Sequence, residues 1–491
     1  MTNLSGTNLN NGSAVGPQGE GMDSPSNFPT YPAYKDSGVE WLGEVPEHWA
    51  IFSLKRSVDG CTNGLWGDEP DGENDLAVIR VADFDRATCR VGLDKLTYRS
   101  ITQKERASRL LQSGDLLIEK SGGGEKTLVG CVVLFEHDFE AITSNFVARM
   151  RPLHGFDSGF LCYSFDSLYQ GKVNFPAIKQ TTGIQNLDSE SYLQERFCFP
   201  TLAEQTQIAR FLDHETARID ALIEEQQRLI ELLKEKRQAV ISHAVTKGLD
   251  PTVPMKDSGV EWLGEVPAHW NVGTLRWYAT IQGGVAKGKD YEGRETVVMP
   301  YLRVANVQNG YVDLAEVKEI AVLESEVERY RLRAGDVLMN EGGDNDKLGR
   351  GTVWQAQIDP CLHQNHVFAI RPNGLLRAEW LAAFTQAEQA RTYFYLNSKQ
   401  STNLASISAS NVMSLALPIP SEKEQLEILT YLEADRIRHE ELTAVAVSTV
   451  ELLQERRSAL ISAAVTGKID VRGGKPPAST QAPEPAVAEA N

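Results

Sequence analysis

Several side chains of this sequence could support catalysis or bind a metal, but their spacing matches no established motif. The segment from Gly283 to Asp290 resembles a phosphate-binding loop, yet Asp290 replaces the Ser or Thr that would hold magnesium. Cys361, His363 and His366 lie close together, but no second ligand pair has the spacing of a zinc site. The nine histidines show no triad spacing. We therefore expect no catalytic residue, cofactor or metal in this chain.

Two Gly-Asp segments are followed by residues suited to binding DNA. Leu111-Gln-Ser-Gly-Asp-Leu-Leu117 and Leu332-Arg-Ala-Gly-Asp-Val-Leu338 each lead into a Gly-rich stretch. Arg, Lys, Asn, Gln and Ser side chains read base edges, and backbone amides and basic groups bind phosphates. The same stretch could instead be a solvated hairpin tip. The candidates are Lys120, Ser121, Gly122 and Lys126 after the first segment, and Asn345, Lys347 and Arg350 after the second.

A second group of candidates is polar and occurs in pairs of corresponding positions. Its members are Asn145 and Asn365, Lys179 and Lys399, and Gln180 and Gln400. Arg80 and Arg303 end predicted strands at equivalent places, where a phosphate contact and a structural ion pair are equally good interpretations.

The chain is an internal duplication. Residues 35–49 return as residues 256–270 with 14 of 15 positions identical. The correspondence continues through more divergent segments, such as Lys179-Gln-Thr-Thr-Gly-Ile184 and Lys399-Gln-Ser-Thr-Asn-Leu404. The repeated unit is therefore a whole domain plus its connector, and it predicts two similar structures in one chain.

The first part of each copy predicts a strand-rich α+β domain. Short alternating apolar runs, such as residues 76–81 and 129–135, are separated by Gly and Asp. One short helix is expected near residues 161–168, and its counterpart near residues 380–390.

The second part of each copy predicts a long helix. Residues 204–245 contain neither Pro nor Gly, and apolar residues recur in heptad register. Because such an apolar stripe needs a partner, we expect the two helices to pair as an antiparallel coiled coil with pseudo-two-fold symmetry. The alternative is that each helix packs only on its own domain. The predicted seam contains Ile208, Leu212, Ile219, Leu222, Leu229, Leu233 and Val240, and then Ile428, Leu432, Leu442, Ala446, Leu453 and Leu460.

These patterns divide the chain into six segments. The tails, rich in small residues and proline, are expected to be disordered. The segments are a tail at 1–29, a strand-rich domain at 30–200, a long helix at 201–250, a second strand-rich domain at 251–420, a second long helix at 421–470, and a tail at 471–491.

Composition favours a soluble, cytoplasmic protein with no membrane span. No run approaches 18 apolar residues, the N-terminus does not resemble a secretion signal, and the six cysteines are scattered. The net charge of −18 is unfavourable for non-specific binding to DNA. Residues 30–200 carry 18 basic against 25 acidic side chains, and residues 251–420 carry 16 against 19. Any DNA binding must therefore use local basic groups or the help of partners.

The sequence resembles the specificity subunit of type I restriction–modification systems. The resemblance rests on the duplicated segment 35–49, the run at 114–124, the motif Gln180-Thr-Thr-Gly-Ile184 and the helix start at 202–208, and it covers about residues 30–470. It implies two target-recognition domains in tandem, each reading one half of an asymmetric bipartite site in double-stranded DNA.

The resemblance also implies partners. Two methyltransferase (modification) subunits would dock on the helices and bring S-adenosylmethionine, and restriction or motor subunits would use ATP and magnesium. Two other interpretations remain: a stand-alone enzyme, which the missing motifs disfavour, and a non-catalytic two-headed adaptor that binds proteins.

Overall fold

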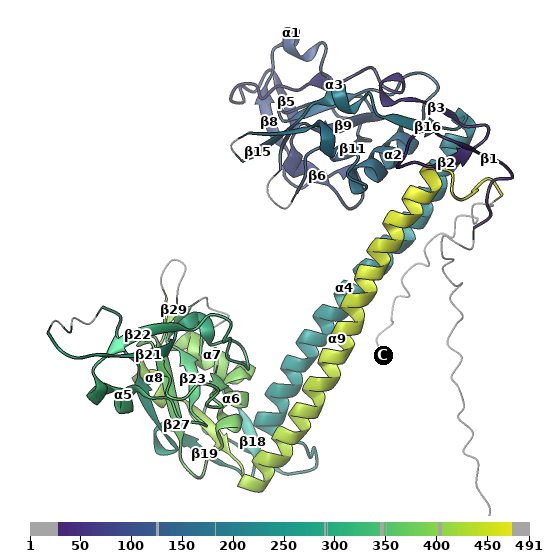
Figure 1. Ribbon diagram of the computed structural model, residues 1–491. Helices are drawn as coiled ribbons and strands as arrows, with labels where there is room; N and C mark the ends of the chain where they lie inside the picture. Colours follow the sequence, from purple (N-terminus) through teal and green to yellow (C-terminus); the bar gives the residue numbers. More distant parts are fainter. Residues whose placement is uncertain are drawn as a thin grey trace, which may run out of the picture. The chain divides into compact units, whose positions relative to one another are not determined.

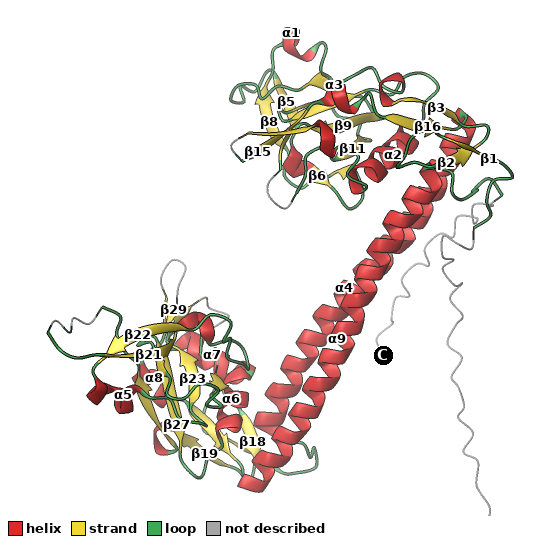
Figure 2. Cartoon of the chain, viewed as in Figure 1, coloured by secondary structure: helices red, strands yellow, loops and turns green. Residues whose placement is uncertain are grey.

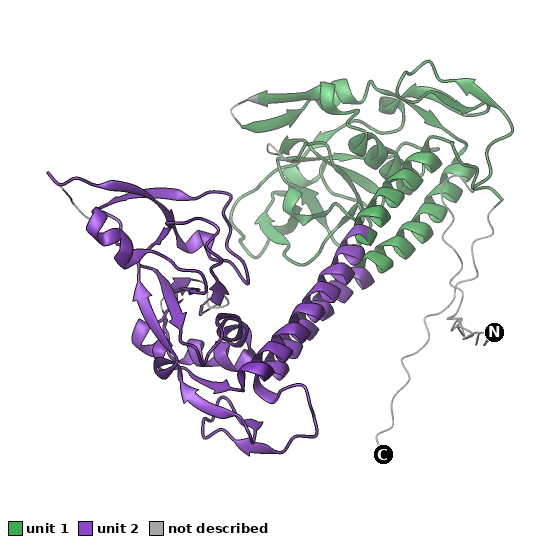
Figure 3. Ribbon diagram, turned by 60° about the horizontal axis from the view of Figure 1, so that its bottom comes forward, with its two compact units in different colours: residues 1–224, 449–491 green, residues 225–448 purple. Residues whose placement is uncertain are grey.

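The computed structural model divides the chain into two compact units (Figure 3). Unit 1 consists of residues 1–224 and 449–491, and unit 2 of residues 225–448. The residues described are 28–123, 127–181, 183–288, 291, 293–343, 348–349, 351–400 and 405–473, with Thr181 described by its backbone alone. Each unit therefore contains one α+β domain and about half of each of two long helices (Figure 1).

A six-stranded sheet forms the centre of the domain in unit 1. Strand β9 (Asp115–Glu119) is buried along its whole length because it pairs with a strand on each side and both sheet faces are covered. Leu116 and Ile118 belong to one core cluster, and Leu117 belongs to another on the opposite face. The sheet order is β4 (Thr62–Asn63), β13 (Val147–Met150), β9, β11 (Val132–Phe135), β7 (Arg90–Val91) and β6 (Phe84–Asp85).

Two smaller three-stranded sheets flank this centre. One has the order β12 (Ala141–Thr143), β5 (Asp75–Ile79) and β8 (Thr97–Ser100); the other has the order β10 (Ser121–Gly122), β15 (Ile184–Leu187) and β14 (Ile178–Thr181). The remaining elements are two strand pairs, β1 (Tyr34–Asp36) with β2 (Glu44–Pro46) and β3 (Ala50–Ser53) with β16 (Arg196–Phe199), and the helices α1 (Gln103–Arg106), α2 (Ser158–Gln170) and α3 (Ser189–Tyr192).

The domain in unit 2 repeats this plan. Its central sheet has the strand order β20 (Ala279–Gly283), β27 (Val367–Pro372), β23 (Val337–Asn340) and β25 (Gly351–Val353). A second sheet has the order β22 (Lys318–Val322), β21 (Val297–Leu302) and β26 (Leu362–His363). A third has the order β24 (Gly342–Gly343), β29 (Ala405–Ser406) and β28 (Lys399–Gln400). The pairs β17 (Met255–Asp257) with β18 (Glu265–Pro267) and β19 (Asn271–Thr274) with β30 (Ala416–Ile419) correspond to β1–β2 and β3–β16, and the helices are α5 (Glu324–Tyr330), α6 (Ala378–Gln386), α7 (Glu388–Leu396) and α8 (Ala409–Met413).

The single helix predicted near residues 380–390 is two helices in the structure. The chain leaves helical geometry at Ala387, between α6 and α7. The backbone groups freed there are bonded by the adjacent long helix: Gln238 Nε2 donates to the Gln386 carbonyl at 2.6 Å, and Ser242 Oγ accepts from the Glu388 N–H at 2.9 Å. Contacts from a distant element therefore decide this break.

The two long helices are α4 (Leu202–Lys247) and α9 (Glu422–Val465), which Figure 2 shows in red. Gly248 and Gly467, just past their ends, both have positive φ, as helix-terminating glycines commonly do. In unit 1 the helices run antiparallel, because Gln207 near the start of α4 donates to the Val471 carbonyl, whereas Asp220 pairs with Arg457 at 3.0 Å. In unit 2, Ala244 and Val245 of α4 share a core with Ile428 of α9.

The observed helix seam departs from the heptad prediction at two positions. Ile208, Leu212, Ile219 and Leu233 are buried as predicted. Leu229 and Leu442, however, are 42% and 48% exposed, so their assignment to the seam is wrong. The α-helix has 3.6 residues per turn, so two turns span slightly more than seven residues. Residues spaced by strict heptads therefore shift gradually around the helix along its length, and some of them leave the buried face.

The repeated segments 35–49 and 256–270 attach each domain to the start of a long helix. In unit 1 the Glu204 carboxylate accepts from Tyr31 Oη at 2.8 Å and Trp49 Nε1 at 3.2 Å, and lies 3.0 Å from His48 Nε2. In unit 2, Glu424 accepts from Trp270 Nε1 at 2.8 Å. The near-identity of the two segments therefore has a structural cause.

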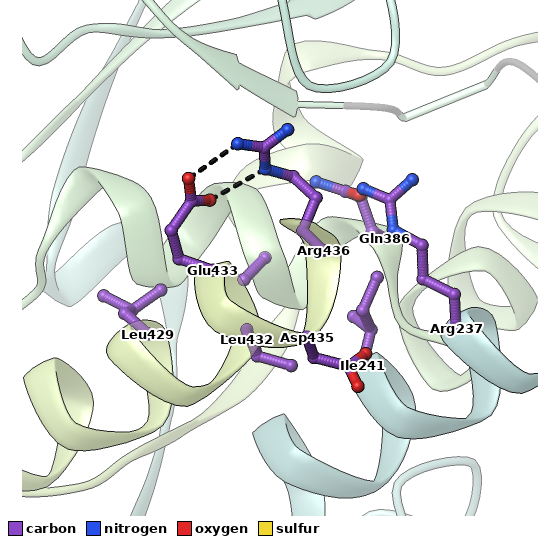
Figure 4. A pocket seen from close by; sticks show the side chains of 9 residues that line it. Arg237, Ile241, Gln386, Leu429, Leu432, Glu433, Asp435 and Arg436 are labelled. Atoms are coloured by element: carbon purple, nitrogen blue, oxygen red, sulfur yellow. Dashed lines mark hydrogen bonds and ion pairs between the residues drawn. The ribbon is translucent and has the colours of Figure 1, made fainter. Parts of the chain in front are cut away.

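Unit 2 has a second joint between its domain and the helices (Figure 4). A small open hollow of about 130 Å³ lies between α4, α6 and α9, with Ile241, Leu429 and Leu432 along its wall. Glu433 and Arg436 form a bidentate ion pair at its rim, with hydrogen bonds of 2.6 and 2.8 Å.

The packed part of unit 1 extends almost to the last described residue. Val471 is buried in the core, and the Asp470 N–H donates to the Pro29 carbonyl. None of the described helices is long and apolar enough to cross a membrane.

Candidate nucleic-acid interface

The residues considered for a metal site do not assemble one. Among the described residues no group of three His, Cys, Asp or Glu could hold a metal ion. His363 is buried, with Nδ1 bonded to the Val367 carbonyl at 2.7 Å, and burial lowers its pKa. Burial also raises the pKa of the Cys131 and Cys361 thiols to about 12, so neither is poised as a thiolate nucleophile.

The described candidates of unit 1 other than Arg80 lie near the end of strand β9. The Lys120 N–H donates to the Phe146 carbonyl at 2.8 Å, and the Lys120 carbonyl accepts from the Leu187 N–H at 2.8 Å. The chain around Lys120 is therefore fixed between the β12–β13 turn and strand β15. Its ammonium group donates to Asn63 Oδ1 at 2.7 Å. Asn145 precedes Phe146 in the same exposed turn.

The three-stranded sheet beside Lys120 presents an exposed polar row. Ser121 of β10, Asn186 of β15 and Lys179 of β14 lie directly opposite one another across the strands. Ser121 Oγ donates to Asn186 Oδ1 at 2.6 Å. Lys179 is 74% exposed and pairs with Asp188 at 2.8 Å, which lowers the pKa of that carboxyl group. The row combines hydrogen-bonding groups suited to base edges with a cation suited to a phosphate.

The next row of residues across the same three strands is partly buried. Gly122, Gln185 and Gln180 are opposite one another. Gln185 is buried and its Oε1 accepts from the Val129 N–H at 3.1 Å, whereas Gln180 is exposed. Gly123, which follows with φ +64°, has no room for a side chain, because a Cβ atom would lie 2.7 Å from the Thr127 carbonyl oxygen. The Gly-rich stretch thus starts a strand of a second sheet and is not merely a hairpin tip.

Unit 2 has the same arrangement with different side chains. Lys399, Ser406 and Gly342 are opposite one another, as are Gln400, Ala405 and Gly343. Lys399 and Gln400 are exposed, and Gln400 Nε2 donates to Ser398 Oγ at 2.8 Å.

Glu341 of unit 2 occupies the position that Lys120 has in unit 1. Its N–H donates to the His366 carbonyl at 2.9 Å, and its carbonyl accepts from the Ile407 N–H at 2.8 Å. Glu341 Oε2 lies 2.7 Å from His366 Nδ1, and the Asn365 amide lies 3.3 Å from His366 Nε2. The predicted Asn365 therefore lies in the equivalent site.

Arg80 and Arg303 lie apart from these rows, in local ion pairs. Arg80 donates to both carboxylate oxygens of Asp83 at 2.8 and 3.1 Å, and Arg303 lies 3.6 Å from Glu316. These contacts favour the structural interpretation of both arginines. Four other candidates, Lys126, Asn345, Lys347 and Arg350, lie outside the described residues.

Sequence reasoning missed several residues of the two sites. They are Asn63, Phe146, Asn186, Glu341, His366 and Ser406. Aligning the two copies would have revealed Glu341, because it corresponds to the candidate Lys120. The chain therefore carries two copies of one α+β domain, each with a polar surface at the end of a central strand.

Comparison with known proteins shows what the chain is similar to. Residues 267–441 match the type I restriction modification DNA specificity domain. The chain is 27% identical over 338 residues to the type I restriction enzyme EcoKI specificity subunit of Escherichia coli (strain K12), covering 66% of this chain and 68% of that protein. It is 22% identical over 446 residues to the putative type I restriction enzyme MjaX specificity subunit of Methanocaldococcus jannaschii, covering 88% and 96%.

A solved chain from a type I R-M system has the same fold, with a TM-score of 0.64 and 15% identity over 86% of this chain and 98% of that one. The chain is thus similar, over these stretches, to specificity subunits of type I restriction–modification systems. This similarity favours DNA-target specificity over the two-headed protein adaptor.

Proposed function

We propose that each domain of this chain reads one half of an asymmetric bipartite site in double-stranded DNA. The observation that carries the proposal is the pair of equivalent strand-end sites, in which one backbone framework holds Lys120 and Ser121 in unit 1 but Glu341 and Gly342 in unit 2. Base recognition depends on side-chain donors and acceptors, so two such sites would select different sequences.

The residues we assign to DNA are those of the two polar surfaces. Lys179 and Lys399 are placed on phosphates, and Ser121, Asn145, Asn365 and Lys120 on base edges or the adjacent backbone. Gly122 allows close approach of the chain, and Gln180 and Gln400 border the surface.

Partners would supply the chemistry. Apolar side chains stay exposed along α9 at Leu426, Tyr431, Ile437 and Leu442, and such a surface favours protein docking. We assign it to two methyltransferase subunits, which would bring S-adenosylmethionine. Restriction or motor subunits would bring ATP and magnesium, and this chain would bind no cofactor. Because the substrate is genomic DNA, we place the complex in the cytoplasm.

We further propose that the long helices set the spacing of the two half-sites. Each helix continues from one unit into the other, since one boundary between the units lies within α4, after residue 224, and the other within α9, after residue 448. A continuous helix rises about 1.5 Å per residue, so its length would fix how many base pairs separate the half-sites.

Domain exchange tests the proposal. Residues 30–200 are replaced by the corresponding domain of another specificity subunit, and methylated adenines are mapped across the genome of cells expressing the complex. We expect one half of the methylated motif to change and the other half to persist. Exchange of residues 251–420 is the matched control and should alter the other half alone. An unchanged motif in both strains would reject the proposal.

A second assay tests whether the chain is itself an enzyme. The purified chain is incubated with target DNA and labelled S-adenosylmethionine, with and without the modification subunits. We expect methyl transfer only when those subunits are present, and transfer by the chain alone would contradict a non-catalytic role.

A further inference from the structure

The two strand-end sites hold opposite charges in the same backbone framework. The N–H and carbonyl of Lys120 are bonded to Phe146 and Leu187, and those of Glu341 to His366 and Ile407, all at 2.8–2.9 Å. The backbone at this position is thus held by the same two hydrogen bonds in both units. A cation in one copy and a carboxylate in the other cannot recognise the same chemical group.

Glu341 is oriented and still accessible. Glu341 Oε2 accepts from His366 Nδ1 at 2.7 Å, which leaves His366 Nε2 to accept from the Asn365 amide at 3.3 Å. The glutamate side chain is 32% exposed and the histidine ring 56%. A carboxylate has about four lone-pair sites, so the hydrogen bond to His366 leaves capacity for a further donor.

The strand position beside Glu341 also carries a smaller residue than the position beside Lys120. Asn63, which bonds Lys120, is paired with Ala148 in the sheet of unit 1. The equivalent residue of unit 2 is Gly283, paired with Phe368, and a Cβ atom built there would have no heavy atom within 4 Å. Among the described residues, the strand position that holds the Asn63 amide in unit 1 therefore carries no side chain in unit 2.

We propose that Glu341 is a specificity-determining residue that accepts a hydrogen bond from the N4 amino group of a cytosine. This inference rests on the proposed function of unit 2 as a DNA reader. In the major groove, carboxylates pair with the cytosine amino group, whereas guanine presents two acceptors there. A carboxylate also repels phosphates, so Glu341 contributes discrimination between bases and not general affinity.

Competition binding by the assembled complex tests the inference. The target is first mapped from the methylated motif, and duplexes then carry each of the four base pairs at each position of the half-site assigned to unit 2 by domain exchange. Wild-type protein should require cytosine at one position. Glu341→Gln keeps the side-chain shape but adds donors, so the preference for cytosine there should fall at least about fivefold.

Two further variants make the test decisive. Glu261→Gln, an equal charge change at an exposed residue of the repeated segment, should leave every preference unchanged. His366→Phe introduces the ring that unit 1 has at this position and removes the bond that orients Glu341, so it should weaken the same cytosine preference. If Glu341→Gln fails to assemble, an unchanged preference in His366→Phe overturns the inference.

A transplanted pair provides the converse experiment. Glu341→Lys with Gly283→Asn rebuilds the Lys120–Asn63 pair of unit 1 in unit 2, and the preference should shift from cytosine to guanine, whose O6 and N7 accept from lysine. An unchanged base preference in Glu341→Gln, or a retained cytosine preference in the transplant, overturns the inference, leaving Glu341–His366 as a hydrogen bond that only holds the turn. The proposed function fails separately, if exchange of residues 251–420 changes no half-site.

Discussion

At the scale of single residues, one buried carboxylate explains the most similar part of the two copies. Glu204 lies in the first turn of α4 and receives hydrogen bonds from Tyr31 and Trp49. The repeated His-Trp sequence is needed wherever a domain must be joined to a helix start in this way. Its identity in the two copies therefore reflects attachment and not recognition.

Replacing Glu204 should destabilise unit 1. Glu204→Ala leaves two buried donors without an acceptor, and we expect a loss of about 2–4 kcal/mol. This loss of stability is measured by urea unfolding followed by tryptophan fluorescence. The midpoints of the transitions are compared, because a protein with two units need not unfold in a two-state transition. Glu225→Ala, at an exposed position of α4, is the control. If Glu204→Ala had the same urea midpoint as Glu225→Ala, the structural role of Glu204 would be contradicted.

Lys179 should bind a phosphate group of the DNA backbone in the complex. Its exposed ammonium group pairs only with the surface residue Asp188 among the contacts of the described residues, so it can exchange that partner for DNA. Lys179→Ala should lower affinity for all sequences alike and reduce the slope of log K against log salt by about 0.9. Salt titration of the assembled complex measures this slope, and Lys104→Ala, on α1, is the control. A changed base preference with an unchanged slope would instead place Lys179 on a base.

At the scale of elements, packing contacts and not heptad spacing alone decide which residues of the long helices are buried in the seam. Leu229 and Leu233 are four residues apart on α4, yet Leu229 is exposed and Leu233 is buried. A strict heptad pattern assigns both to the seam. The partner surfaces that cover each turn of the helix decide which leucine is buried.

The same substitution at these two positions should therefore have unequal effects. Leu233→Ala should cost about 2–4 kcal/mol because it removes buried apolar contacts and leaves a cavity, whereas Leu229→Ala should change stability by less than about 0.5 kcal/mol. Both residues lie in unit 2, so the same calorimetric transition reports both variants. Equal destabilisation would mean that the heptad assignment was right.

At the scale of the whole molecule, charge limits what the chain can do alone. Its net charge is −18, and neither recognition domain is basic overall. Local cations such as Lys179 and Lys399 therefore lie in a field that repels the phosphate backbone. Modification subunits that contribute positive surface would change this balance.

The isolated chain should accordingly bind DNA weakly. In electrophoretic titration at physiological salt, we expect no nanomolar complex with target duplex, and tight binding only after the modification subunits are added. A duplex with a scrambled target is the control for specificity. Nanomolar, sequence-specific binding by the purified chain alone would show that the partners are not needed for affinity.

The sequence by itself determined the duplication, the α+β class and the long helices, and it indicated the family that the chain resembles. These follow from patterns that repeat along the chain: identical segments, alternating apolar residues and uninterrupted helical periodicity. The Gly-Asp and Lys-Gln motifs also indicated Lys120, Ser121 and Lys179 as candidate DNA contacts.

Only the tertiary structure decided which of these residues share a surface. Strand pairing places Asn186 between Ser121 and Lys179, although 65 residues separate Asn186 from Ser121 along the chain. Hydrogen bonds from α4 divide the predicted helix at Ala387, and the two frameworks around Lys120 and Glu341 match only when the sheets are formed. Contacts between residues distant in sequence depend on how the strands pair and pack, and no local periodicity encodes that choice.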